Sequence, residues 1–323
     1  MKKALQTALI SGALLGLSAA SASAQWNPTR TVRLIVPYSA GTATDTLSRA
    51  VAQKLSESLG QQVIVDNQPG ANGIVGTEAL AKAVKDGHTL GMVAANHVVT
   101  PALYPRLPYD TLRDFTPVTI LGAVPFILVA HPSLPAKSVQ ELIALAKARP
   151  GQLLYSSAGN GSPPHLAGEL LKTMAGIDIV HVPYKGLAPG LIDLIAGQVS
   201  LMFPAISAGL PQVSAGKLRA LAVTSLKRSP AAAGLPTMDE SGLKGYEVYS
   251  WIGIMGPAGL PKEVVTRLHA EGNRIVKLPD VSQRFGTLGI DIIGTTPEEF
   301  ARIMQTDLVK FGKLVKASGA KID

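Results

Sequence analysis

The chain has 323 residues, of which 46% are apolar and 16% charged, and it contains no cysteine. This composition is typical of a globular protein and excludes the disordered and collagen-like classes. The length predicts about two domains, each large enough to bury a core. The absence of cysteine excludes disulfide scaffolds, cysteine zinc sites, iron–sulfur clusters and thiol nucleophiles.

The formal net charge of +8 is mild and scattered along the chain. Lys310, Lys313 and Lys316 recur at three-residue spacing, which favours a solvated helix face over a phosphate-binding stripe. The excess is compatible with attraction of small anions, and we expect no nucleic-acid partner.

The first 24 residues are typical of a secretory signal peptide. Two lysines follow Met1, a mostly apolar run covers residues 4–17, and small residues end the segment at Ala24. Cleavage after Ala24 would leave a mature chain that begins at Gln25. We therefore expect a periplasmic protein. A retained membrane anchor is the alternative, but the apolar run is interrupted and too short for a span.

Apolar β-branched runs alternate with helical periodicity along the mature chain. Residues 31–37 are predicted to form a strand, and leucine or valine then recurs every four residues from Leu47 to Leu59 as one helix face. This alternation predicts βαβ units and a largely parallel sheet. The other predicted elements are strands at 63–65, 89–93, 126–130, 153–156, 179–182, 199–203, 218–224 and 249–255, helices at 74–84, 138–148, 163–175, 187–196 and 207–215, an inter-domain connection at 227–245, and helices starting at Pro261 and Pro297.

Capping signals mark three of the helix starts. Ser138 with Glu141, and Thr296 with Glu299, have the spacing of a capping box. Ser162 is placed to cap the helix that follows it, where proline occupies the first helical position.

Three predicted loops each leave an apolar strand, carry glycine or hydroxyl residues and lead directly into a helix. They are residues 38–45, 156–165 and 182–186. Helix N-termini of this kind bind anions through free amides and the positive end of the dipole, and Gly159 with Gly161 allows a concave nest of amides. Ordinary turn chemistry is the alternative for any one loop. Together, at one edge of an open α/β sheet, the three predict a ligand crevice.

Signatures of catalysis and metal binding are missing from the sequence. Residues 159–162 match neither a nucleophile elbow nor a dinucleotide fingerprint. Asp178 and His181 flank a predicted strand but form a poor metal ligand set. His165 has no acidic residue at a spacing that would orient it, so a donor to the crevice is favoured over a general base. We therefore expect no enzyme activity, no metal and no cofactor.

Seven segments along the mature chain carry a resemblance to a known family. They are RLIVPYSAGTATD at 33–45, VDNQPGANG at 65–73, PALY at 101–104, YDTLRDF at 109–115, SSAGNGSPPHLAGE at 156–169, VPYKG at 182–186 and GKLRALAVT at 216–224. In this order they resemble the Bug family, the extracytoplasmic solute-binding proteins of tripartite tricarboxylate transporters.

The resemblance implies an α/β protein with the type II periplasmic-binding-protein fold, in which two α/β lobes joined by a double crossover hinge close on a carboxylated solute. It implies lobe 1 at residues 25–124 and 248–323, and lobe 2 at residues 125–247. The implied partners are a small organic carboxylate and the membrane permease subunits of the transporter, and a monomer is the simplest expectation. A ligand-binding subunit of a membrane sensor and, less favoured, a secreted hydrolase or isomerase are the alternatives.

The resemblance also implies which residues bind the ligand. Many members carry aspartate where this chain has Pro204, which disfavours an amino-acid ligand and favours a plain or aromatic carboxylate. The expected ligand-binding residues are Tyr38, Ser39, Ala40, Gly41, Thr42, Asp45, Asn96, Ser157, Ala158, Gly159, Asn160, Gly161, Ser162, His165, Tyr184, Lys185, Pro204 and Ala205.

Overall fold

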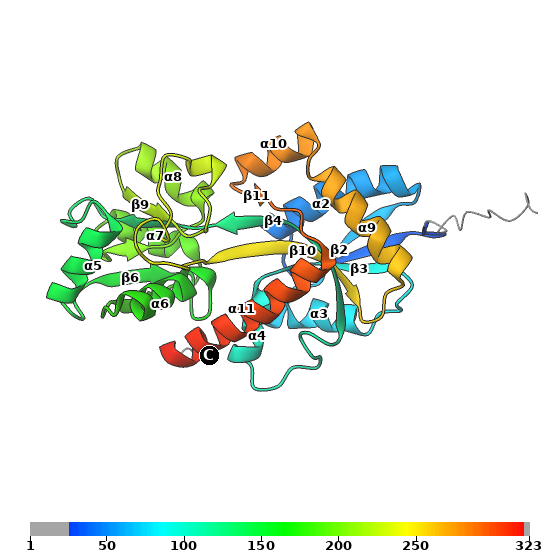
Figure 1. The fold of residues 1–323 in the computed structure, drawn as a ribbon, viewed down its shortest axis with the longest axis horizontal. Helices are drawn as coiled ribbons and strands as arrows, with labels where there is room; N and C mark the ends of the chain where they lie inside the picture. Colours follow the sequence, from blue (N-terminus) through cyan, green and yellow to red (C-terminus); the bar gives the residue numbers. More distant parts are fainter. Residues whose placement is uncertain (1–25, 320–323) are drawn as a thin grey trace, which may run out of the picture.

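The predicted alternation of strands and helices is present, but it is divided between two sheets. In the computed structural model, which describes residues 26–319, one sheet has six strands in the order β11-β4-β10-β3-β1-β2 and the other has five in the order β7-β6-β8-β5-β9. Figure 1 shows the two sheets as separate lobes, each flanked by its own helices. The predicted signal peptide at residues 1–24 lies outside the described residues.

Lobe 1 is built on the six-stranded sheet. Its strands are β1 (Val32–Val36), β2 (Val63–Asn67), β3 (Thr89–Ala94), β4 (Phe115–Pro125), β10 (Tyr249–Pro257) and β11 (Asp291–Ile292). Its helices are α2 (Ala43–Leu59), the short η1 (Ala71–Gly73), α3 (Ile74–Ala81), α4 (Asn96–Leu103), α9 (Lys262–Ile275), α10 (Pro279–Thr287) and α11 (Pro297–Ser318). The predicted face of α2 from Leu47 to Leu59 is buried against the sheet, which confirms the four-residue periodicity.

Lobe 2 is built on the five-stranded sheet. Its strands are β5 (Ile127–Ala130), β6 (Leu154–Ser157), β7 (Val180–Pro183), β8 (Leu201–Met202) and β9 (Arg219–Val223). Its helices are α5 (Val139–Ala148), α6 (Pro163–Ala175), α7 (Leu187–Ile195), α8 (Ile206–Ser214) and the short η2 (Pro230–Ala232). Within residues 26–319, no helix combines the length and apolar character needed to cross a membrane.

The prediction of a largely parallel sheet is wrong at one strand in the body of each sheet. In lobe 2, β6 pairs in parallel with β7 and β8, but β5 runs antiparallel to β8 and β9. In lobe 1, β1 pairs in parallel with β2 and β3, but β10 runs antiparallel to β3 and β4. Each reversed strand arrives from the other lobe and is inserted between strands of its new sheet. This pattern confirms two lobes joined by a double crossover hinge.

The two crossover segments are tied together by one buried side chain. The first crossover passes from β4 to β5 through Phe126, and the second enters β10 after Val248. The Phe126 N–H donates to Thr224 Oγ1 at 3.0 Å, and Thr224 Oγ1 donates to the Val248 carbonyl at 2.6 Å. Thr224 is fully buried, so this link joins the hinge strands away from water.

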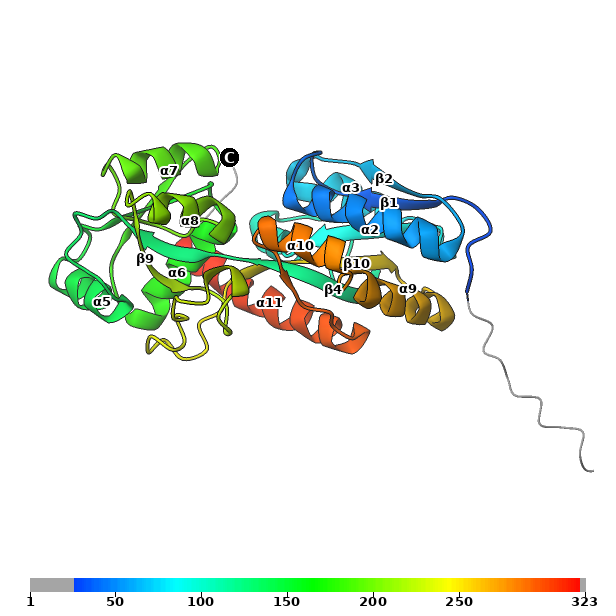
Figure 2. The ribbon, with the colours of Figure 1, turned by 90° about the horizontal axis from the view of Figure 1, so that it is seen from above.

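Helix α11 extends from lobe 1 toward lobe 2 and packs against α4 and α6 (Figures 1 and 2). It also holds the hinge strand β10. Trp251 of β10 is fully buried, its ring lies edge-on to Phe300 with 5.1 Å between centroids, and its Nε1–H donates to Asp307 Oδ2 at 3.1 Å. Lys310 Nζ completes this cluster at 2.8 Å from Asp307 Oδ1. The core is therefore continuous across the hinge.

The three predicted helix caps form to different extents. Thr296 and Glu299 form the complete capping box. Ser138 accepts from the Glu141 N–H as predicted, but the Glu141 carboxylate accepts from the Lys137 N–H, so only half of that box forms. Ser162 makes no capping bond, because its hydroxyl donates to the Gly159 carbonyl at 2.7 Å. Two prolines at the start of α6 leave little for a cap to satisfy.

Candidate functional site

The three predicted loops meet around one cleft of about 880 Å³ between the lobes. They follow β1, β6 and β7, so the carboxyl ends of parallel strands from both sheets face each other across the cleft. The residues that line it are Tyr38, Thr42, Ala43, Thr44, Asn72, Ala94, Asn96, Tyr104, Ala158, Gly159, Asn160, Gly161, Ser162, Pro163, Pro183, Tyr184, Lys185 and Ser250.

The lobe 1 side of the cleft is the N-terminus of α2. Thr42 is the N-cap, and its Oγ1 accepts from the Asp45 N–H at 3.3 Å. Ala43 and Thr44 follow in the first turn, where backbone N–H groups have no intrahelical acceptor. The positive end of the α2 dipole and these amides therefore open on the cleft, as an anion site requires.

Asp45 lies beneath this loop and not in the cleft lining. Its side chain is buried, and its oxygens accept from the Gly41 N–H at 2.8 Å, from Arg49 at 3.1 Å and from Asn67 Nδ2 at 2.9 Å. Burial alone would raise the pKa of Asp45, but these bonds and the Arg49 charge hold that pKa below its ordinary value. The expectation of a ligand contact is corrected here, because the ionised carboxylate already serves as the anchor of the loop.

A wall of hydrogen-bonded polar side chains joins the loop after β1 to the end of β3, the neighbouring strand in the sheet. The Tyr38 hydroxyl donates to Asn96 Oδ1 and accepts from the Ala94 N–H at 3.0 Å. Asn96 Nδ2 donates to the Asn72 carbonyl at 3.0 Å, and Asn72 Nδ2 donates to Thr100 Oγ1 at 3.3 Å. These hydrogen bonds hold the side chains of the wall in place before any ligand binds. A ligand therefore has little side-chain motion to restrict.

The lobe 2 side of the cleft is the loop of residues 158–162, which we call the β6–α6 loop. Gly159 and Gly161 have φ of +116° and +72°, values that favour glycine. Their amides do not form the expected nest toward the ligand. The Gly159 N–H donates to Ser157 Oγ at 3.1 Å, and the Gly161 N–H donates to His165 Nδ1 at 3.0 Å. Both amides are thus directed into the lobe.

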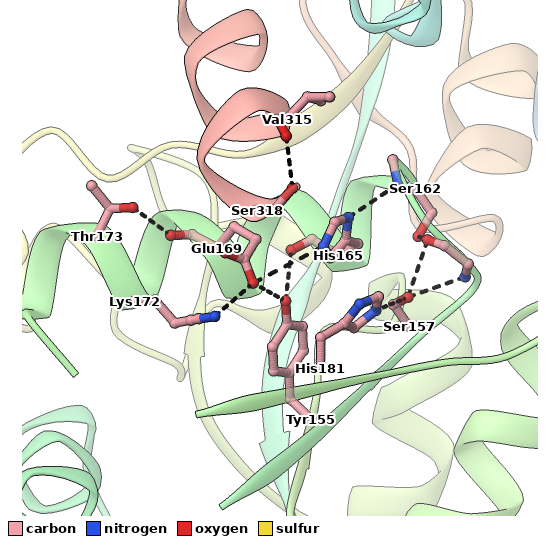
Figure 3. Close-up of polar contacts among 12 residues, drawn as sticks. Tyr155, Ser157, Ser162, His165, Glu169, Lys172, Thr173, His181, Val315 and Ser318 are labelled. Atoms are coloured by element: carbon pink, nitrogen blue, oxygen red, sulfur yellow. Dashed lines mark hydrogen bonds and ion pairs between the residues drawn. The ribbon is translucent and has the colours of Figure 1, made fainter. Parts of the chain in front are cut away.

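Two stacked histidines support this loop from below (Figure 3). His165 and His181 have ring centroids 4.0 Å apart with an interplanar angle of 22°. His181 Nε2 lies 2.6 Å from Ser157 Oγ, and His181 also stacks on Tyr155. His165 is only 2% exposed, so it is not a donor to the crevice as expected but an acceptor inside the lobe. Ser157 is likewise buried beneath the lining.

The third loop contributes Tyr184 and Lys185. The Tyr184 hydroxyl donates to Asp193 Oδ2 at 2.6 Å, and this bond to the carboxylate raises the pKa of Tyr184 to about 12. Lys185 is exposed, and it lines the cleft. Lys185 therefore brings a positively charged residue to the lobe 2 side of the cleft.

Five more of the expected residues lie outside the cleft lining. Ser39, Ala40 and Gly41 are exposed next to it. Pro204 and Ala205 lie at the hinge, where the Pro204 carbonyl accepts from the Ile127 N–H at 2.9 Å and Ala205 bridges Phe126. Both residues are held by backbone contacts to the first crossover and lie outside the lining.

The sequence did not point to several residues that line the cleft. Asn72 lies in segment 65–73, which carries part of the family resemblance, and its φ of 56° is uncommon for a residue other than glycine. Tyr104 follows α4, and Ser250 lies on the hinge strand β10. Neither residue belongs to a loop that follows a strand and leads into a helix, so that pattern did not indicate that they line the cleft. Within residues 26–319 no group of His, Asp or Glu side chains is arranged to hold a metal ion. His181, which the sequence offered with Asp178 as a weak metal ligand set, contacts Ser157.

Buried histidines should make the protein sensitive to acid. Burial lowers the pKa of His97, His165 and His181 from 6.5 to about 4. The unfolded chain then binds more protons than the folded chain below pH 6.5, so the free energy of unfolding should fall as pH drops from 6.5 toward 4. The expected loss is roughly 2 kcal/mol for His97 alone by pH 5.

Urea titrations at pH 7.5, 6 and 5 measure this loss. Most carboxylates protonate mainly below this window, so the histidines dominate it. Burial raises the pKa of Glu247 and Asp291, and these two groups act in the opposite direction. The variant His131→Asn, at a partly exposed histidine, should leave the curve unchanged. A free energy of unfolding that stays flat from pH 7.5 to 5 would contradict the prediction.

Comparison with known proteins places this geometry in context. Residues 47–320 match the family described as "Tripartite tricarboxylate transporter family receptor". The chain is 35% identical over 306 residues to Protein BugT of Bordetella pertussis, covering 94% of each chain. It is similar to the solved structure of Rpa4515 of R. palustris with adipate, with 38% identity, a TM-score of 0.74 and coverage of 91% and 99% of the two chains. It is also similar to MatC (Rpa3494) of Rhodopseudomonas palustris with bound malate, with 32% identity, a TM-score of 0.70 and coverage of 89% and 99%.

Proposed function

This chain belongs to the tripartite tricarboxylate transporter receptor family, and we propose that it captures a small organic dicarboxylate in the cleft between its lobes. Within the broader class of carboxylates, a dicarboxylate is favoured because two similar structures were solved with adipate and with malate. Both of these ligands carry a carboxylate at each end.

The observation that carries the proposal is the N-terminus of the 17-residue helix α2, which opens on the cleft. Its first-turn amides and its dipole suit one carboxylate. Lys185 lines the same cleft from lobe 2 and suits a second negative charge. A ligand with two carboxylates could therefore bridge the lobes and stabilise the closed arrangement, since only contacts made in both lobes favour closure.

We further propose that the protein is exported to the periplasm and delivers its ligand, as a monomer and without chemical conversion, to the membrane permease of a tripartite transporter. The predicted signal peptide and the family support export and delivery. We infer lobe boundaries at residues 25–124, 125–247 and 248–323, because the chain changes sheet at Phe126 and returns at Tyr249.

A thermal-shift screen of residues 25–323 tests the proposal. The panel contains malate, adipate, citrate, benzoate and glutamate, added after any copurified ligand has been removed. A dicarboxylate at 100 times its dissociation constant should stabilise the protein by about 2.7 kcal/mol, with no product detected by NMR. No shift with any carboxylate would contradict the proposed ligand class, and turnover would contradict a receptor role.

A further inference from the structure

We propose that His165 is a positioning residue for ligand binding: by accepting the Gly161 N–H, it holds the β6–α6 loop in the shape that lines the cleft. The inference rests on the proposed function, because it assumes that this loop contacts the ligand. His165 itself is buried and lies outside the lining, so it acts through the loop.

The start of α6 offers the loop few bonds of its own. Pro163 and Pro164 occupy the first two positions of α6, and proline has no N–H. The Ser162 side chain makes no capping bond. The Leu166 N–H donates to the Ser162 carbonyl at 3.0 Å. The bond from the Gly161 N–H to His165 Nδ1, also at 3.0 Å, adds a side-chain link between the loop backbone and the first turn of α6.

A second link reaches the other glycine of the loop through the stacked partner ring. His181 Nε2 contacts Ser157 Oγ at 2.6 Å, and Ser157 Oγ accepts from the Gly159 N–H at 3.1 Å. Because His181 stacks on His165 at 4.0 Å between centroids, the two rings fix each other and hold both glycine amides inward (Figure 3). The loop then presents its remaining atoms to the cleft.

The charges around His165 suit a neutral ring whose Nδ1 accepts. Glu169 Oε1 lies 4.0 Å from His165 Nε2, but it already accepts from the Tyr155 hydroxyl at 2.6 Å and from Lys172 Nζ at 3.2 Å. Burial, and after it the charge of Lys172, opposes a positive charge on the ring and lowers the pKa of His165. With Nε2 protonated on the side of Glu169, Nδ1 is left to accept the Gly161 N–H.

Two substitutions at His165 distinguish the effect of the hydrogen-bond acceptor from the effect of the side-chain volume. In His165→Asn the amide oxygen can take the place of Nδ1, whereas His165→Leu fills the site without an acceptor. We expect His165→Asn to bind adipate or malate within about threefold of the wild type. His165→Leu should lose about tenfold in affinity, because the Gly161 N–H is left buried and unpaired.

The control is Leu166→Ala at the next residue of α6. Leu166 is 1% exposed and belongs to the core, so this variant should be less stable yet keep its affinity below its melting temperature. A leucine variant that binds like the wild type, or an asparagine variant that binds as weakly as the leucine variant, would overturn the proposal.

A readout without ligand keeps the inference separate from the proposed function. In ¹⁵N NMR spectra of the ligand-free protein at pH 7.5, His165 Nδ1 should be unprotonated, and the Gly161 amide should exchange slowly with solvent. In His165→Leu the Gly161 amide should exchange at least about tenfold faster. Equal exchange in both proteins would overturn the positioning role even if every carboxylate failed to bind the wild type.

Discussion

The substitution Gly159→Val is expected to lower the affinity for a dicarboxylate at least about 100-fold while both lobes stay folded. Gly159 has a φ of +116°, which a β-branched residue cannot adopt without strain. A Cβ at this position would also meet the Tyr184 carbonyl oxygen at 3.3 Å. The β6–α6 loop must therefore shift, and it would push the third loop at the same time, so two walls of the cleft lose their shape together.

Isothermal titration calorimetry with malate or adipate measures the loss, and circular dichroism checks the fold. Gly234→Val is the matched control, because Gly234 lies in lobe 2, is exposed, has no positive φ and would meet no atom within 4 Å. The control should bind like the wild type. If Gly159→Val kept the wild-type dissociation constant, the β6–α6 loop would not belong to the binding site.

The loops around the cleft were predictable from the sequence because their signals are local. Glycine, hydroxyl residues and a helix start directly after a buried strand are all read within about ten residues of Gly41 or Gly159. Parallel pairing then brings the ends of neighbouring strands to the same edge. That rule accounts for the loops after β6 and β7, which pair in parallel in lobe 2, whereas the loop after β1 belongs to the other sheet and reaches the cleft because the two lobes face each other.

The orientation of the groups in those loops was not predictable, because it depends on distant partners. The Gly159 amide is directed inward by Ser157, whose hydroxyl is fixed by His181, 24 residues away. Asp45 looks like a ligand contact in the sequence, yet Asn67 and Arg49 hold it beneath the loop. Such choices follow from packing between elements, which no local pattern contains.

The antiparallel direction of β5 and β10 was also not predictable from local patterns. The run at Tyr249 was predicted as a strand, but its insertion between β3 and β4 follows from the chain crossing twice between lobes. The strand β4 and the helix α4 were not predicted at all. Tyr104, which follows α4, was not predicted to line the cleft, although Asn96 at the start of the same helix was.

The substitution Trp251→Ala is expected to lower the free energy of unfolding by about 3–5 kcal/mol, the cost of removing a large aromatic side chain from a core. Trp251 is fully buried on the hinge strand β10 and packs on Phe300 of α11. Its loss also removes the indole donor from Asp307, a buried residue whose other carboxylate oxygen stays paired with Lys310. The lost hydrogen bond leaves Asp307 Oδ2 without its indole donor in a buried place, which adds to the cost of the cavity.

Urea denaturation at pH 7.5 measures this change, and Trp251→Phe separates its two parts. Phenylalanine keeps most of the apolar volume but cannot donate to Asp307, so a loss of about 1–3 kcal/mol is expected from the unpaired acceptor and the smaller ring. The control is Val309→Ala on α11, the helix that carries Asp307. It removes a side chain that is 56% exposed and should change the free energy of unfolding by less than about 0.5 kcal/mol. The strand β10 is a crossover between the lobes, and α11 packs against α6 of lobe 2. A Trp251→Ala protein as stable as the wild type would therefore mean that α11 does not stabilise the hinge through this contact.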